Sequence, residues 1–157
     1  MTRAAPTRFA VDSNVIVYLF SGDVAKADRA EALVAGGNSK PVISTQVMNE
    51  VTLVMSRKMG LSWPEIERIL DDVEVLCEVV PLTLDVHKEA RRIAAHYGFR
   101  FYDSCIIAFA LLADCEVLYS EDMHHGQVIF EQLTVINPFL ERSQSERAKH
   151  DGCDSTT

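Results

Sequence analysis

Four acidic residues lie within or directly beside apolar segments of this chain, where an unpaired charge is costly. They are Asp12 in FAVDSNVIVYLF, Glu50 in STQVMNEVTLVM, Asp103 in RFYDSCIIAFALLA and Asp122 after VLYSE. Burying a carboxylate without a partner costs on the order of several kcal/mol or forces it to take up a proton. These four acids are best explained if they converge around a shared cation, and oxygen ligands favour Mg²⁺ or Mn²⁺.

Each of the four acids also has an explanation that needs no metal. Asp12 is followed by Ser13 and Asn14, and residues of these types are typical of a helix N-cap. Asp103 could be an acid at a helix N-terminus, which the helix dipole favours. Glu50 could pair with a basic residue on a helix edge, and the fourth acid could belong to a solvated loop. The interpretation as a metal site therefore depends on all four acids being considered together, because no single one of them requires a metal.

Strands and helices alternate along the chain and must position these acids. Five short runs predict strands: FAVD, KPVI, VLCEVV, EVLYS and LTVIN. Helices are predicted over 23–35, 45–58, 83–97 and 102–113, and a further helix is predicted to begin at Ser62. This alternation indicates an α/β fold with a parallel sheet. Ligands of such sheets bind beyond the carboxyl ends of the strands, where Asp12 and Asp122 are expected to lie.

The other two acids lie on predicted helices. Glu50 lies near an apolar stripe that includes Val47 and Val54. Asp103 opens the most apolar helix and shares a face with Ile106. Both carboxylates can therefore point toward the interior.

Composition and charge limit the class of protein. The chain has 157 residues, of which 48% are apolar, enough for one complete hydrophobic core. Its longest uncharged apolar run, SCIIAFALLA, is far short of the roughly 18 residues that a membrane span needs. The four cysteines show no zinc-ligand spacing, which suits free thiols in the cytoplasm. A net charge of −8 excludes an ordinary basic nucleic-acid clamp.

The order of these segments resembles that of a PIN domain. The resemblance rests on VDSNVIVYLF, QVMNEV, FYDSCIIAFA and YSEDM, and it extends from about Phe9 to Phe139. The segments HHGQ and INPF further resemble bacterial VapC-type toxins of toxin–antitoxin pairs. The resemblance implies a three-layer α/β/α sandwich with a mainly parallel sheet in one domain over residues 1–142. The polar segment 143–157 is expected to be a disordered tail.

The resemblance also implies a cytoplasmic, metal-dependent endoribonuclease that uses Mg²⁺, with Mn²⁺ as an alternative. It places Asp12, Glu50, Asp103 and Asp122 at the family's four acidic positions, as catalytic and metal-binding residues. Supporting positions around these acids are Ser13, Asn14, Ser120 and Glu121. Whether Glu121 replaces or assists Asp122 stays open. The products would carry 5′-phosphate and 3′-hydroxyl ends.

An acidic nuclease must still attract RNA. Basic residues that could line a phosphate path are Lys88, Arg91, Arg92 and Arg100. Each could equally lie on a solvated helix face. Nearby aromatic residues could stack on bases or pack at a core edge: Phe99, Phe101 and Tyr102. The neighbouring His124 and His125 have no third ligand at a suitable spacing, so a loop role is favoured over a transition-metal site.

The sequence also allows predictions about protein partners and about alternative functions. A VapC-like toxin is expected to form a homodimer and to bind an antitoxin, and the acidic charge suits a partner with basic side chains. Haloacid dehalogenase-like phosphotransfer is disfavoured because Asn14 stands where a second Asp is needed, and a response regulator would need a late lysine that is not found. A catalytically silent PIN-like scaffold that binds RNA or protein remains the alternative.

Overall fold

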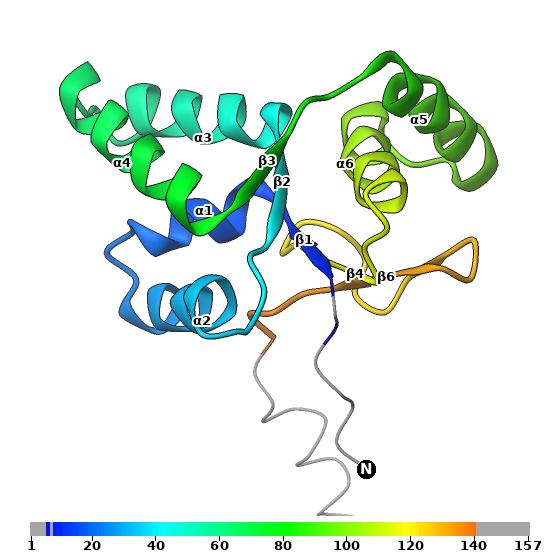
Figure 1. Cartoon of the computed structure of the whole chain (residues 1–157), viewed down its shortest axis with the longest axis horizontal. Coiled ribbons are helices and arrows are strands. Elements are labelled where there is room, and N and C mark those ends of the chain that lie inside the picture. The colour runs from blue at the N-terminus through cyan, green and yellow to red at the C-terminus, as the bar shows by residue number, and fades with distance from the viewer. Residues whose placement is uncertain (1–5, 7, 141–157) are drawn as a thin grey trace, which may run out of the picture.

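A six-stranded sheet forms the centre of the molecule (Figure 1). The computed structural model describes residue 6 and residues 8–140, so the predicted tail and residues 1–5, 7, 141 and 142 of the predicted domain lie outside the described part. The strands are β1 (Phe9–Val11), β2 (Val42–Ser44), β3 (Glu78–Val80), β4 (Val117–Tyr119), β5 (Val128–Ile129) and β6 (Leu133–Ile136). Their order is β3-β2-β1-β4-β6-β5. All neighbouring strands are parallel except β5 and β6, which confirms the predicted, mainly parallel sheet.

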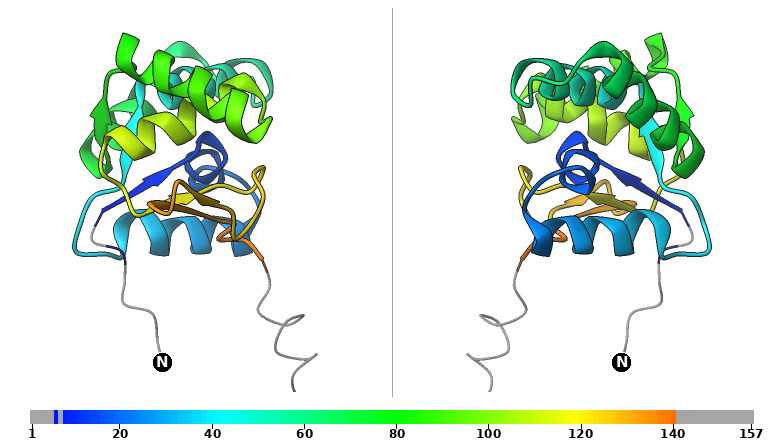
Figure 2. Two further views of the ribbon diagram at one scale, coloured as in Figure 1. Left: turned by 90° about the vertical axis from the view of Figure 1, so that its right-hand side faces the viewer. Right: turned by 90° about the vertical axis from the view of Figure 1, so that its left-hand side faces the viewer.

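Helices cover both faces of this sheet and complete a three-layer α/β/α sandwich (Figures 1 and 2). One face packs against α1 (Ser13–Leu19), α2 (Val24–Ala35), α3 (Thr45–Arg57) and α4 (Trp63–Leu76). The other face packs against α5 (Leu84–Tyr97) and α6 (Phe101–Leu112). The predicted fold class is therefore confirmed.

Strand β1 shows why the sheet needs helices on both faces. Phe9 and Val11 pack into the cluster with α1 to α4, whereas Ala10 packs into the cluster with α5 and α6. Successive residues of a strand point to opposite faces, so an entirely apolar strand is stable only if both faces are covered. On α6, all residues from Ser104 to Ala110 are buried, which agrees with its predicted position between the sheet and a neighbouring helix.

The predicted helix boundaries follow the capping residues. Ser62 and Glu65 form a reciprocal capping box at the start of α4. Gly98 ends α5 in the left-handed conformation, with φ of 74°, which a glycine adopts without steric cost. The strand predicted in VLCEVV begins later than expected, because α4 continues to Leu76 and β3 starts at Glu78.

Strand β5 was not predicted from the sequence. It forms an antiparallel hairpin with β6, and the turn between them places Phe130 at φ 47° and Glu131 at φ 58°. Turns with positive φ usually contain Gly or Asn, and neither residue is present here, so the sequence carries no turn signal.

Two further expectations concern the environment of the chain. Among the described helices, none has both the length and the apolar character to cross a membrane. The three cysteines in this part of the chain, Cys77, Cys105 and Cys115, are free and buried. Burial raises the pKa of Cys77 and Cys115 to about 11, so these thiols are protonated near neutral pH.

Candidate active site

Asp12 is the most deeply buried of the four acids, with 5% of its surface exposed. It follows β1 and caps α1, where its Oδ1 accepts a hydrogen bond from the backbone N–H of Ser13 at 2.7 Å. Its Oδ2 accepts a hydrogen bond from the Ser120 hydroxyl at 2.8 Å. The N-cap interpretation is thus correct, and it leaves the carboxylate at the carboxyl end of the parallel sheet, where ligands of such sheets bind.

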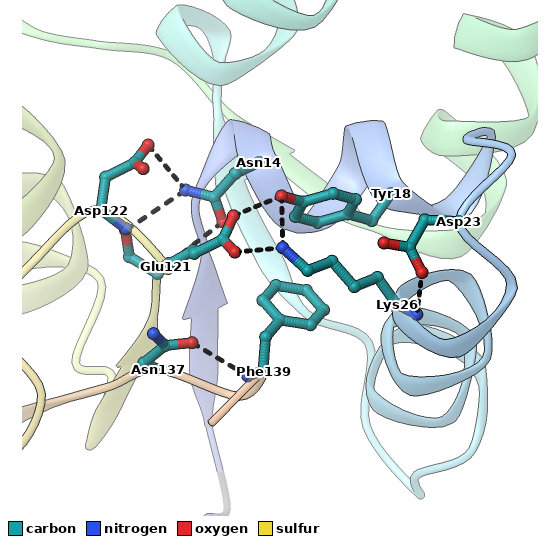
Figure 3. Close-up of polar contacts among 9 residues, drawn as sticks. Asn14, Tyr18, Asp23, Lys26, Glu121, Asp122, Asn137 and Phe139 are labelled. Atoms are coloured by element: carbon teal, nitrogen blue, oxygen red, sulfur yellow. Dashed lines mark hydrogen bonds and ion pairs between the residues drawn. The ribbon is translucent and has the colours of Figure 1, made fainter. Parts of the chain in front are cut away.

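Asn14 and Ser120 link Asp12 to Asp122. The Asn14 Nδ2 donates to Asp122 Oδ2 at 3.2 Å and lies 3.4 Å from the Ser120 Oγ. The same Ser120 oxygen accepts the backbone N–H of Asp122 at 3.3 Å. These contacts connect the loop after β4 to the first turn of α1 (Figure 3), so two acids more than 100 residues apart in sequence are fixed relative to each other.

Glu121 points away from Asp122 (Figure 3). Its carboxylate accepts hydrogen bonds from the Tyr18 hydroxyl and from the Lys26 ammonium, which also donates to the Tyr18 oxygen at 2.9 Å. Its backbone N–H donates to Asn14 Oδ1 at 3.2 Å. Lys26 neutralises this carboxylate, so the Glu121 side chain belongs to an ion pair beside the acids, while its backbone orients Asn14.

The two remaining acids come from helices in opposite layers. Glu50 lies on α3 and accepts a hydrogen bond from the Gln46 side-chain amide at 3.0 Å. Asp103 lies in the first turn of α6. Both are partly exposed, in contrast to the buried Asp12.

Electrostatic coupling shows that the four acids share one region. Burial raises the pKa of Asp12 to about 6, and the negative charges of Glu50 and Asp122 add to this effect. Burial also raises the pKa of Asp103; Arg100 opposes the increase, and the charges of Asp122 and Glu50 reinforce it. Glu50 is therefore close enough to repel Asp12, and Asp103 is close enough to repel Asp122.

The donor set fits a hard divalent cation. Within residues 8–140, none of the four acids forms an ion pair with a lysine, arginine or histidine. As the side chains lie here, no described group of three or more His, Cys, Asp or Glu residues is arranged to hold a metal ion. Four like charges without a cation repel one another, so their separation in this arrangement is expected. Oxygen-only donors concentrated at the end of a sheet match the ligands of Mg²⁺ or Mn²⁺.

A pocket of about 220 Å³ opens beside two of the acids. It is bounded by the loop before α6, by α6 itself and by the segment that follows β4. Its lining residues are Phe99, Arg100, Asp103, Ile107, Asp122, Met123, His124, Gln127 and Val135. The pocket is therefore an open hollow directly next to the Asp103 and Asp122 carboxylates.

The four predicted RNA contacts lie in two places. Arg100 lines the pocket beside Asp103. Lys88 and Arg91 are exposed on α5. Arg92 is also on α5, but its guanidinium bonds to Glu89 at 3.1 Å and lies 4.4 Å from the Phe130 ring centre.

Lys26 and Gln127 were not singled out from the sequence, and Tyr18 was expected only as part of an apolar helix face that could contact a dimer partner or an antitoxin. Lys26 and Glu121 are 95 residues apart, and no local pattern indicates their pairing. Gln127 lies in the HHGQ segment. That segment contributed only to the resemblance to VapC-type toxins and indicated no role for the Gln127 side chain. The contacts of Lys26 and Tyr18 with Glu121 become visible only when the loop after β4 packs against α1 and α2 (Figure 3).

A three-layer α/β/α sandwich with Asp12 and Asp122 at the carboxyl edge of a mainly parallel sheet defines the class of this domain. The PIN domain family model matches residues 9–130, and the chain belongs to this family. No curated protein matches the sequence.

Solved structures share the fold at low sequence identity. A toxin–antitoxin complex from Klebsiella pneumoniae has a TM-score of 0.66 and 18% identity, covering 85% of this chain and 98% of that one. VapC20 from Mycobacterium tuberculosis, described as a sarcin-ricin loop cleaving toxin, has a TM-score of 0.56 and 17% identity, covering 70% and 86%. VapBC2 from Rickettsia felis, bound to a promoter DNA fragment, has a TM-score of 0.56 and 17% identity, covering 74% and 89%.

Proposed function

We propose that the protein is a metal-dependent endoribonuclease and the toxin of a toxin–antitoxin pair. The observation that supports this proposal is a set of four acids in one region of a PIN domain. They repel one another pairwise, and none of them is paired with a described basic side chain. The similar solved structures include a toxin that cleaves RNA and two toxin–antitoxin assemblies, which supports the same function here.

The residues that would hold the metal ion are Asp12, Glu50, Asp103 and Asp122. A bound Mg²⁺ or Mn²⁺ would supply a nucleophilic hydroxide near neutral pH and offset the charge that develops on the phosphate. Ser120 and the Ser13 N–H fix both oxygens of Asp12. Asn14 fixes Asp122. These contacts hold two ligands in place before substrate arrives, which reduces the reorganisation needed during the reaction.

Arg100 is the basic residue best placed for an RNA phosphate, because it lines the same pocket as Asp103 and Asp122. Its guanidinium can offset part of the repulsion between the acids and the RNA backbone. Lys88 and Arg91, exposed on α5, would extend this contact along the strand.

The antitoxin and a second copy of the chain are the proposed protein partners. The net charge of −8 suits an antitoxin that places a basic side chain among the acids. Such a side chain would replace the missing counter-charge and block the site.

Cleavage of purified RNA with Mg²⁺, with Mn²⁺ and with a chelator tests the proposal. We expect cleavage that requires metal, yields 5′-phosphate ends and is lost in Asp103→Asn. Asp71→Asn, which changes an exposed acid on α4, is the matched control and should cleave normally. Products with 2′,3′-cyclic phosphate would contradict the mechanism, since the RNA's own 2′-hydroxyl would then be the nucleophile.

A silent scaffold is the second candidate, and one observation favours it. The described side chains offer no ready-made group of three ligands. If the protein binds neither Mg²⁺ nor Mn²⁺ and still binds RNA or a protein, the scaffold function replaces the nuclease.

A further inference from the structure

We propose that the pocket beside Asp103 and Asp122 binds one nucleobase of the RNA, next to the phosphodiester that is cleaved. This inference rests on the proposed function and adds a determinant of substrate choice. Both acids line the pocket, so a base inside it would place its own phosphate close to the site.

The size and walls of the pocket fit a single planar base. Ile107, Met123 and Val135 supply apolar surface, and the volume is about 220 Å³. Pockets for drug-sized ligands measure roughly 300–1,000 Å³, so this one suits a smaller group. Two carboxylates, Asp103 and Asp122, outnumber the single guanidinium of Arg100 in the wall, so the net negative charge favours a neutral ring over a phosphate as the occupant.

Phe99 provides a rigid surface for stacking. Its ring is stacked on Tyr97, with ring centres 5.2 Å apart and planes 4° from parallel. The Tyr97 hydroxyl in turn accepts the backbone N–H of Phe130 at 2.9 Å. Phe99 therefore lines the pocket while its ring is fixed by stacking on Tyr97. Proteins that bind unpaired bases typically stack them on such fixed aromatic rings.

Gln127 can recognise the edge of the base. Its backbone N–H donates to His124 and its backbone carbonyl accepts from Val135, so the loop is fixed without using the side chain. The side-chain Nε2 makes one long contact, 3.4 Å, with the Val128 carbonyl, and in the described structure Oε1 has no hydrogen-bond partner. An amide with a free acceptor and a weakly used donor can form paired hydrogen bonds with a base.

Methyl NMR of the metal-free protein tests the pocket directly. The four nucleosides adenosine, guanosine, cytidine and uridine are titrated in turn, with chelator present, while the methyl signals of Ile107, Met123 and Val135 are followed. We expect at least one nucleoside to shift these signals. Unshifted signals with all four nucleosides would overturn the proposal.

Variants separate stacking from edge recognition. Phe99→Leu keeps apolar bulk but removes the ring, and should weaken nucleoside binding about tenfold or more. Gln127→Ala should bind nucleosides but lose most of the discrimination among them. Gln132→Ala, an exposed glutamine on the neighbouring hairpin, should leave both properties unchanged. Equal binding and equal discrimination in all three variants would contradict the assignment.

Mapping of cleavage sites on a randomised RNA distinguishes this inference from the nuclease proposal. The wild type should prefer one base beside the cleaved bond, and Gln127→Ala should lose that preference while it still cleaves. If cleavage is absent but the nucleoside shifts persist, the nuclease proposal fails and the base pocket stands. Cleavage without base preference and without nucleoside shifts would reject the pocket alone.

Discussion

The two acids carried by the sheet differ from the two carried by helices. Asp12 and Asp122 follow the adjacent strands β1 and β4 and are linked through Ser120 and Asn14. Glu50 and Asp103 come from opposite helical layers. Among the described residues, the Glu50 side chain bonds only to Gln46, one turn away on its own helix. One half of the site is therefore fixed by hydrogen bonds, whereas the other half is coupled to it mainly by charge.

This difference indicates how the site would respond to a cation. The sheet-borne pair is preorganised, so its geometry should change little when metal binds. Asp122 is exposed but is held by Asn14 and by its own backbone, whereas the partly buried helix-borne acids have fewer contacts among the described residues. The side chains of Glu50 and Asp103 are therefore the ones expected to move toward the ion.

Removal of the Asp12 charge should have the largest effect. Asp12→Asn can keep the hydrogen bond from the Ser13 N–H, while its Nδ2 can only donate to the Ser120 oxygen. It removes a charged metal ligand, so RNA cleavage should fall at least about 1,000-fold. The fold should persist, because Asn caps a helix as well as Asp does and because the raised pKa of Asp12 shows that its charge costs stability. Cleavage assays and circular dichroism check both points. Activity within tenfold of wild type would show that Asp12 is not a ligand.

Loss of the Ser120 hydroxyl should have an intermediate effect. Ser120→Ala removes the bond to Asp12 and the link to Asp122, so metal affinity and cleavage should each fall roughly 10- to 100-fold. Thr52→Val removes a hydroxyl that bonds only within α3 and serves as the control. Equal losses in the two variants would mean that the effect is general destabilisation.

The stability of the metal-free protein should increase as the pH falls. The folded pKa of Asp12, about 6, lies above its ordinary value of 3.8, so ionisation costs stability above pH 6 and this cost disappears toward pH 4. Between pH 7.5 and pH 5, the contribution of Asp12 to the free energy of unfolding should rise by about 1–2 kcal/mol.

This contribution is measured as the difference in the free energy of unfolding between wild type and Asp12→Asn, obtained by urea unfolding with chelator at each pH. This difference is needed because Glu65 and Glu78 act in the opposite direction: hydrogen bonds from Ser62 and Arg8 lower their pKa values. Identical pH profiles for the two proteins would refute the prediction.

The ion pair beside the acids should have the smallest effect. Lys26→Gln leaves Glu121 without its counter-charge, and because both side chains are partly exposed the cost should be below about 1 kcal/mol. Cleavage efficiency should fall only a few-fold, and Lys26→Arg should restore it. A loss as large as that of Ser120→Ala would mean that the pair controls Asp122 more strongly than its contacts indicate.

The sheet and the sheet-borne acids were predictable because local rules determine them. Apolar β-branched runs that alternate with helical segments specify a doubly covered parallel sheet, and its carboxyl edge is where Asp12 and Asp122 lie. Helix ends at Ser62 and Gly98 were predictable because capping depends on neighbouring residues.

The missed features depend on contacts between distant segments or on unusual backbone geometry. The Lys26–Glu121 pair and the stack of Phe99 on Tyr97 exist only after α2, α5 and the loops pack together. The β5–β6 hairpin turns through Phe130 and Glu131, whose side chains do not indicate a positive φ. The arrangement of Glu50 relative to the other acids likewise follows from packing between layers.

Binding of Mn²⁺ in the absence of RNA tests the central claim most directly. Electron paramagnetic resonance gives the free Mn²⁺ concentration for the wild type and for Asp12→Asn, Glu50→Gln, Asp103→Asn and Asp122→Asn. We predict binding by the wild type, weaker binding in every variant and the largest losses at Asp12 and Asp122. No binding by the wild type, or equal binding in all five proteins, would contradict a shared four-acid metal site.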